Sequence, residues 1–329
     1  MTRTCSGILL LAALLLALLL ALLPAAGAEK PKETAAPLVP VLELPPLESG
    51  TLFEIPTDEK YPEGLTPPQE EGYLYPEDGG NPTGYADPSI TVNLGTGRIY
   101  GTDYLYARVK IASPTQLRAL IAGRPASEQT VSGPGLAKRV QAVLAVNGDY
   151  CGGEDFKRGV LMRQEDMLRT KCDGETDVLV VDRSGDLRIL KAALPEDVEA
   201  IEDQAVNIFT FGPALVIDGV RQEPEANRQH HSEDPAQRTA ICQTGPLEYL
   251  IITSEGPGNE NSAGLSMKQF TDLVASIPEV RTAYNLDGGT SSTLVFRRDG
   301  DNWQKINGLS NPKIRPLMDI IYFSSAWSE

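Results

Sequence analysis

Short apolar runs separated by turn-forming residues constrain the fold of this chain more than any other feature. Residues 104–111 (YLYARVKI) alternate between apolar and polar side chains, as a strand with one buried face does. Residues 142–146 (AVLAV) are continuously apolar, which is typical of a strand buried on both faces. Gly, Asp, Asn and Pro lie between most runs, and these residues favour tight turns. The sequence therefore predicts a mainly antiparallel sheet.

Helical patterns are fewer than strand patterns. Residues 266–277 predict the clearest helix, because Ser266 and Gln269 can form a capping box before an apolar stripe. Shorter helices are expected at residues 113–121, 137–141 and 195–201, and the first of these has a proline in its first turn. We therefore expect an α+β fold, with a mostly antiparallel or mixed β-sheet core and a few covering helices, in a single domain that follows a disordered stalk.

The first 88 residues differ in composition from the rest of the chain. Arg3 precedes an apolar run at residues 8–23, and small residues at 26–28 offer a cleavage position, so residues 1–28 are predicted to be a signal peptide. An uncleaved N-terminal membrane anchor is the alternative. Residues 29–88 are rich in proline and acidic residues and predict an extended linker. The folded domain is expected at residues 89–325, in a secreted or cell-envelope protein whose membrane contact is confined to the N-terminal segment.

The charge of the chain excludes one class of partner. With 29 Lys and Arg against 45 Asp and Glu, the formal net charge is −16. Nucleic-acid backbones are bound by clustered basic residues, and the sequence has no basic stripe. Nucleic acid is therefore not expected to be a partner.

The cysteines and histidines predict neither a zinc site nor a required cofactor. Cys151 and Cys172 could form a disulfide in an oxidising compartment, which would leave Cys242 as a buried thiol. The two histidines, His230 and His231, lie in a loop-like stretch without zinc-ligand spacing. We predict no metal site, although a single Ca²⁺ held by Asp side chains and backbone oxygens stays compatible with the sequence.

Residues 281–296 (RTAYNLDGGTSSTLVF) place a carboxylate at the end of a predicted strand. Strand alternation puts Asn285 and Asp287 on the same face. Gly288 and Gly289 allow a ligand to approach the backbone closely, and the hydroxyls of Ser291 and Ser292 follow directly. This pattern predicts an anion-binding site with a carboxylate beside it. A tight hairpin with Asp287 as the turn former is the alternative reading.

Other polar residues also follow apolar runs, and as a set they predict a site for a phosphorylated, polyhydroxylated ligand. Each could instead be a turn former or a solvated surface group. The set consists of Asn147, Asp149, Arg238, Thr239, Glu255, Asn307 and Arg315.

Several motifs of this chain, in this order, resemble the phosphodiester glycosidase family, which is typified by N-acetylglucosamine-1-phosphodiester alpha-N-acetylglucosaminidase. Secreted bacterial relatives are often labelled exopolysaccharide biosynthesis proteins. Two positions depart from the family pattern: Thr290 stands where a third glycine is usual, and Cys242 where glycine is common. The matching motifs are AVNGDY at 145–150, FGPALVIDG at 211–219, RTAI at 238–241, GLSMKQF at 264–270, AYNLDGGTSST at 283–293, and Asn307, Gly308, Arg315 and Asp319 near the end.

The resemblance implies hydrolysis of the bond between the anomeric carbon of a sugar and a phosphodiester. Glycoside cleavage passes through an oxocarbenium-like state that carboxylates stabilise or assist. With this chemistry, Asp287, Asp149 and Glu255 are the candidate catalytic carboxylates. The candidate substrate-binding residues are Asn147, Arg238, Thr239, Gly288, Gly289, Ser291, Ser292, Asn307 and Arg315, with Arg238 and Arg315 assigned to the phosphate. The expected substrate is a phosphorylated glycan or sugar phosphodiester outside the cytoplasm.

Two other functions fit parts of the sequence. A stalked cell-surface domain could bind polysaccharide without cleaving it. A phosphodiesterase could cleave the P–O bond instead, but such enzymes usually clamp metal ions with clustered carboxylates or histidines. The scarcity of histidine argues against a metal site of that kind.

Overall fold

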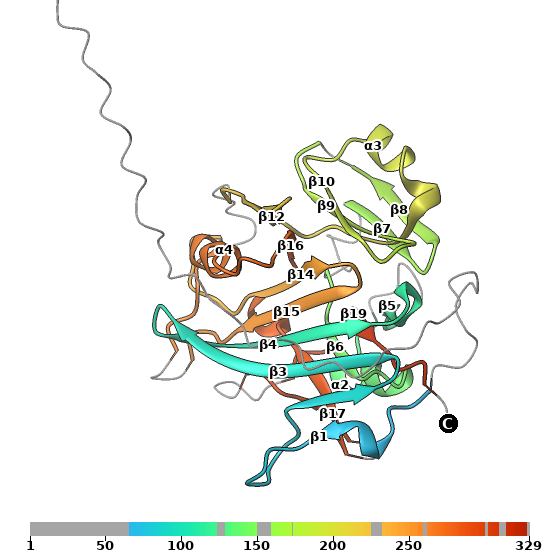
Figure 1. The fold of residues 1–329 in the computed structure, drawn as a ribbon. Helices are drawn as coiled ribbons and strands as arrows, with labels where there is room; N and C mark the ends of the chain where they lie inside the picture. The colour runs from blue at the N-terminus through green and yellow to red at the C-terminus, as the bar shows by residue number, and fades with distance from the viewer. Residues whose placement is uncertain are drawn as a thin grey trace, which may run out of the picture. The chain divides into compact units, whose positions relative to one another are not determined.

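Most of the chain after residue 65 forms three antiparallel sheets, as a computed structural model shows (Figure 1). The structure describes residues 66–123, 129–149, 159–172, 174–224, 232–258, 262–299, 302–308 and 314–327. The predicted signal peptide, most of the predicted linker and both histidines lie outside these ranges. Within them, no helix is long and apolar enough to cross a bilayer.

The largest sheet has nine strands and is built around the long β3–β4 hairpin (Figure 1). Its central strands are buried on both faces, which explains their continuous apolar composition. In spatial order the strands are β1 (Tyr73–Leu74), β2 (Gly84–Asp87), β3 (Ile90–Ile99), β4 (Thr102–Ile111), β15 (Glu248–Ser254), β14 (Thr239–Gly245), β16 (Thr282–Asn285), β12 (Ala214–Ile217) and β13 (Val220–Arg221).

Two five-stranded sheets complete the core. One has the order β10 (Leu187–Leu190), β9 (Val178–Asp182), β11 (Ala205–Phe209), β7 (Gly159–Arg163) and β8 (Asp166–Lys171). The other has the order β18 (Asn302–Lys305), β17 (Leu294–Asp299), β6 (Leu144–Asn147), β19 (Asp319–Phe323) and β5 (Leu117–Ile121). Side chains from all three sheets, among them Leu179, Ile251 and Phe323, share one hydrophobic cluster. The three sheets therefore stabilise one another.

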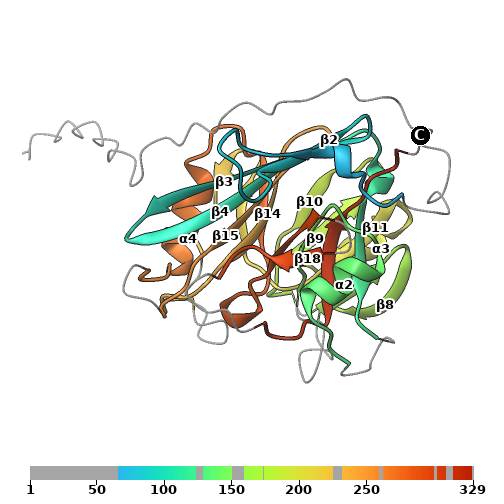
Figure 2. The same ribbon diagram turned by 90° about the horizontal axis from the view of Figure 1, so that it is seen from below.

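Three α-helices occur among the described residues: α2 (Gly133–Arg139), α3 (Pro195–Glu199) and α4 (Met267–Ala275). The helix α4 has the predicted capping box between Ser266 and Gln269, and its apolar side packs on the nine-stranded sheet. The helix α2 packs on the outer face of the β6 sheet, beside β18 (Figure 2).

The fold prediction is confirmed for the antiparallel sheet and the few helices, but two parts of it need correction. The domain is mostly β rather than α+β, and every strand pairing described is antiparallel, so the sheets are not mixed. The helix expected at residues 113–121 is a single 3₁₀ turn, Pro114–Gln116, followed by strand β5. Ser113 caps that turn as a helix start would, and β5 then pairs with β19, so tertiary pairing overrides the local helix signal.

The folded domain begins earlier than the predicted boundary at residue 89. Thr66 bridges to Ser325, β1 and β2 extend the nine-stranded sheet, and the ring of Tyr73 packs edge-on against Phe296 with 5.9 Å between centroids. The buried guanidinium of Arg297 donates to the carbonyl oxygen of Pro68 and lies 3.5 Å from Glu70. Residues 66–88 are therefore part of the domain rather than of the linker.

A chain that starts at Gly80 is expected to be less stable than one that starts at residue 60 by about 2–3 kcal/mol. The shorter chain loses the buried ring of Tyr73, and burial of such a side chain contributes roughly that amount. It also leaves Arg297 without its contacts to Pro68 and Glu70. Urea unfolding of the two chains measures the difference. Equal midpoints and slopes would place residues 66–79 outside the cooperative unit.

Candidate active site

The candidate site lies where strands from all three sheets end. Asn147 is the last residue of β6, and Asp319 is the first residue of the antiparallel neighbour β19, so the two lie at the same edge. Asp287 follows the end of β16, which lies beside the start of β14. Arg163 is the last residue of β7 in the third sheet. These non-local pairings bring together polar residues that are far apart in the sequence.

Asn147 connects the strand ends through its side chain. Its amide nitrogen donates to the carbonyl oxygens of Gly148, at 3.2 Å, and Asp287, at 2.7 Å. Its amide oxygen accepts from the backbone N–H of Thr293, at 3.0 Å, and lies 3.2 Å from the hydroxyl of Thr239. All four hydrogen-bonding positions of the amide are thus occupied by protein groups. Asn147 was predicted to contact substrate, but this geometry makes it a residue that positions Asp287.

Three more of the predicted binding residues form a buried layer behind the turn that follows Asp287. The hydroxyl of Thr239 lies 3.0 Å from that of Ser292. Asn307 donates to the carbonyl oxygen of Ser292, at 3.0 Å, and accepts from the N–H of Leu294, at 2.7 Å. All three side chains are buried. They therefore hold the turn in shape and do not face a ligand.

Asp287 itself faces a small pocket. The residues that line this pocket are Asn147, Gly148, Asp287, Ser291, Pro316, Leu317, Met318 and Asp319. The N–H of Gly288 donates to Oδ1 of Asp287 at 2.8 Å, and Ser291 forms a side-chain hydrogen bond with the same carboxylate. Burial raises the pKa of Asp287 to about 6, and the nearby Asp149 acts in the same direction. Ser291, Gly288 and the positive charge of Arg315 oppose this rise.

The two glycines after Asp287 are required for different reasons. A Cβ atom at Gly288 would lie 2.8 Å from the carbonyl oxygen of Gln237, so a side chain does not fit there. Gly289 has φ +57° and begins the 3₁₀ turn Gly289–Ser291. Arg315 is exposed, and its Nη1 lies 3.4 Å from the hydroxyl of Thr290 in that turn. A positive charge and a hydroxyl therefore lie together on the solvent side of Asp287.

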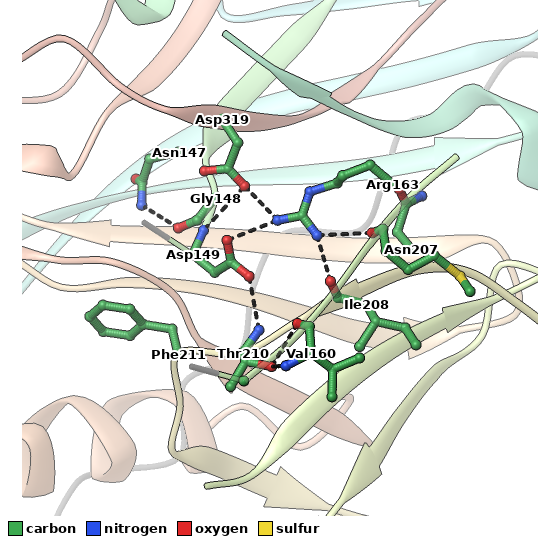
Figure 3. Close-up of polar contacts among 12 residues, drawn as sticks. Asn147, Gly148, Asp149, Val160, Arg163, Asn207, Ile208, Thr210, Phe211 and Asp319 are labelled. Atoms are coloured by element: carbon green, nitrogen blue, oxygen red, sulfur yellow. Dashed lines mark hydrogen bonds and ion pairs between the residues drawn. The ribbon is translucent and has the colours of Figure 1, made fainter. Parts of the chain in front are cut away.

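Asp149 lies deeper than Asp287, in a buried ion-pair cluster with Arg163 and Asp319 (Figure 3). One guanidinium nitrogen of Arg163 lies 2.8 Å from Oδ1 of Asp149 and 2.7 Å from Oδ2 of Asp319. The second oxygen of Asp149 accepts from the N–H of Thr210 at 2.8 Å. Both oxygens of Asp149 are thus bound to protein groups, and Asp149 does not line the pocket.

Asp319 belongs both to this cluster and to the pocket wall. Burial and the negative charge of Asp149 raise the pKa of Asp319 to about 7, against the opposing effect of Arg163. Gly148 permits this arrangement, because a Cβ atom there would lie 2.0 Å from Oδ2 of Asp319. The carboxyl of Asp319 therefore packs directly on the backbone between Asn147 and Asp149.

The other two predicted residues, Glu255 and Arg238, do not line the pocket. Glu255 is buried and accepts a hydrogen bond from the N–H of Gly308 at 2.6 Å. This hydrogen bond stabilises the turn that contains Asn307. Arg238 was predicted to hold phosphate. Its buried guanidinium instead donates to the carbonyl oxygens of Leu265, at 3.1 Å, and Asp234, at 2.8 Å, and burial lowers its pKa to about 10.

Sequence reasoning missed two members of this region as site residues, Arg163 and Asp319. Asp319 was part of the matching terminal motif, so the motif itself could have identified it. Arg163 lies at a strand end without any motif around it, and only the fold shows that it faces the two carboxylates.

The described residues contain no group of three or more His, Cys, Asp or Glu side chains that could hold a metal ion. Cys242 is a buried free thiol, as predicted. Cys151 lies outside the described residues, so its disulfide with Cys172 stays a prediction.

Comparison with known proteins identifies the family. The family model for phosphodiester glycosidases (NAGPA) matches residues 140–324, which include every predicted site residue, and the chain belongs to this family. Its fold is similar to that of the zebrafish N-acetylglucosamine-1-phosphodiester alpha-N-acetylglucosaminidase catalytic domain, described as auto-inhibited by its pro-peptide. That match has 17% identity and a TM-score of 0.58, and it covers 73% of this chain and 84% of the zebrafish chain.

A hypothetical protein from Synechocystis also has a similar fold, with 14% identity and a TM-score of 0.52. That match covers 73% of this chain and 63% of the Synechocystis chain. No curated protein matches the sequence. At these identities the two solved structures bear on the fold alone.

Proposed function

We propose that this protein hydrolyses the glycosidic bond of a sugar 1-phosphodiester, releasing the free sugar and a phosphate monoester. The observation that carries the proposal is the placement of Asp287 in a small pocket with the exposed Arg315 nearby, in a chain of the phosphodiester glycosidase family. The carboxylate is suited to the positive charge that develops at the anomeric carbon. The arginine and the Gly289–Ser291 turn are suited to the phosphate.

The partial burial of Asp287 supports this division of roles. The carboxylate keeps hydrogen bonds from Gly288 and Ser291, so its orientation is set before a ligand arrives. A charge held in a partly water-excluded site interacts more strongly with an oxocarbenium ion than the same charge in bulk water. Because Arg238 is engaged by backbone carbonyls, we assign the phosphate to Arg315 rather than to the predicted pair of arginines.

We propose further that the substrate is a phosphorylated glycan or sugar phosphodiester of the cell envelope or the extracellular space. The apolar run at residues 8–23 with small residues at 26–28 supports export, either as a cleaved signal or as an anchor. The net charge of −16 supports a substrate held by a few local cations rather than by a broad basic surface.

The fate of the anomeric carbon tests the proposed function. The purified full chain is incubated with a panel of aryl and nucleotide sugar phosphodiesters in ¹⁸O-labelled water, and the products are identified by mass spectrometry. We expect the label in the C1 hydroxyl of the free sugar, together with an unlabelled phosphate monoester. Sugar 1-phosphate, or label in the phosphate, would mean P–O cleavage. Tight binding of polysaccharide without any product would favour a non-catalytic domain.

A further inference from the structure

The two oxygens of the Asp319 carboxyl group lie in different environments. Oδ2 accepts from Arg163 Nη2, at 2.7 Å, and from the N–H of Asp149, at 3.4 Å. In Figure 3 the other oxygen points away from Arg163, toward the side on which Asn147 lies. Asp319 and Asn147 both line the pocket that contains Asp287. Asp319 therefore joins a buried ion-pair cluster to the pocket.

The charges of this cluster do not balance. Asp149, Arg163 and Asp319 are each at least 95% buried, and with both carboxylates ionised they carry one net negative charge. A proton taken up by Asp319 brings the net charge of the three side chains to zero. Because a net charge is costly in a buried site, these three side chains favour uptake of that proton. The raised pKa of Asp319 agrees with this charge count.

The proposed reaction needs a group that accepts a proton. A phosphodiester carries one negative charge, whereas the monoester product carries close to two above its second pKa of about 6. Hydrolysis at neutral pH therefore releases one proton from the attacking water. The phosphate leaves readily as an anion, so a base is required more than an acid. A base is most effective when its proton affinity is close to the working pH.

We propose that Asp319 is the general base of this hydrolysis and that Asp149 and Arg163 are positioning residues that set its proton affinity. This inference rests on the proposed function. Asp319 takes a proton from water as the water oxygen bonds to the anomeric carbon. The bond from that carbon to the phosphoester oxygen breaks, and its electron pair stays with the departing phosphate. Asp287 stabilises the positive charge on the sugar meanwhile, and the proton on Asp319 afterwards passes through the pocket to solvent.

The pH dependence of such a base depends on the charged groups around it. Among the described residues, Asp149 after β6 and Arg163 at the end of β7 act directly on Asp319. Asp287 after β16 lines the same pocket, and Arg315 acts on Asp287. Asp149 raises the proton affinity of Asp319, and Arg163 lowers it. Replacement of Asp149 by Asn removes a negative neighbour and keeps the side-chain shape. The acid limb of the pH–rate profile should then move to lower pH.

The test compares kcat and kcat/KM of the wild-type full chain with D319N and D149N between pH 5 and 9, using the donor that the wild-type chain hydrolyses best. D319N is expected to lower kcat roughly a hundredfold, with KM changed less than about twofold. D149N is expected to move the acid limb of kcat/KM down by about one pH unit. D182N is the control, because Asp182 is buried and paired with Arg188, within the β9–β10 hairpin. It should reproduce the wild-type profile.

Three results of these measurements would contradict the inference, each at a different step. If D319N keeps kcat within threefold of wild type, Asp319 is not the base. If D149N leaves the acid limb unmoved, Asp149 does not act through Asp319, and this measurement holds even where D319N does not fold. If the wild-type chain releases free sugar from no donor in the panel, the proposed function fails first and the inference fails with it.

Discussion

Asp287→Asn is expected to lower kcat roughly a thousandfold, because the variant removes the negative charge that faces the developing oxocarbenium ion. The substitution keeps the size of the side chain and one oxygen for the N–H of Gly288. The phosphate contact that we propose for Arg315 is not altered by this substitution, so KM should change little. Initial rates of sugar release at saturating donor concentration measure the effect.

The same substitution is expected to stabilise the protein at pH 8 by about 1–2 kcal/mol. Asp287 has a folded-state pKa of about 6, above its ordinary value of 3.8, so wild-type stability falls as the pH rises from about 4 to 6. Asn cannot ionise, so the free energy of unfolding of the variant does not fall over this pH range. The difference in stability between variant and wild type should therefore vanish near pH 4. Urea unfolding at pH 4 and pH 8 measures both parts. Active-site groups often reduce stability in this way.

Asp272→Asn provides the control for both measurements. Asp272 is a buried carboxylate of helix α4 that lies outside the pocket and pairs with Arg221 of β13 at 2.7 Å. Its loss should cost stability and leave kcat unchanged. Full turnover by D287N would show that Asp287 is a turn former, which is the structural alternative that the sequence left open.

Arg163→Met is expected to destabilise the protein by about 3–5 kcal/mol at pH 8. Arg163 is the cation between two buried carboxylates, and removal of one partner from a buried ion pair has a cost of this size. The variant also loses the contact of the guanidinium with the ring of Phe209, at 3.9 Å from the ring centroid. Unfolding free energies from urea titration test this value.

The cost of Arg163→Met should depend on pH. At pH 5 Asp319 is already protonated, because its pKa of about 7 lies above that pH, so less repulsion remains when the cation is lost. We expect the destabilisation at pH 5 to be about half of that at pH 8. Arg183→Met is the matched control, since Arg183 is exposed and pairs with Glu165 near the surface. A loss that is equal at the two pH values would mean that packing, not charge, accounts for the effect.

The strand pattern of the sequence predicted much of the fold, because alternation and turn residues report local structure directly. Residues 104–111 fall within β4, and residues 142–146 lead into β6. The helix α4 was also predicted, with its capping box. The boundary at residue 89 was wrong because the preceding segment is rich in proline and acid. Its few apolar residues, such as Tyr73, fold only by packing on distant partners.

The candidate site was predicted in part. Strand-end position and the family resemblance identified Asp287, Asn147 and Arg315, but they could not show which polar groups protein partners already occupy. Arg238 donates to the carbonyl oxygens of Leu265, 27 residues away, and of Asp234 in the preceding turn, and no sequence pattern reveals these contacts. Asp149 and Asp319 are separated by 170 residues, so their shared arginine becomes visible only in the fold.

The assembly of the pocket from segments beside β6, β16 and β19 has a consequence for when the pocket forms during synthesis of the chain. The side chain of Asn147 donates to the backbone oxygen of Asp287, which is 140 residues later in the chain. Asp319, which follows both in the sequence, forms part of the pocket wall. A ribosome must therefore synthesise the last of these strands before the pocket exists. A nascent chain that has not yet reached β19 contains Asn147 and Asp287 but no complete pocket.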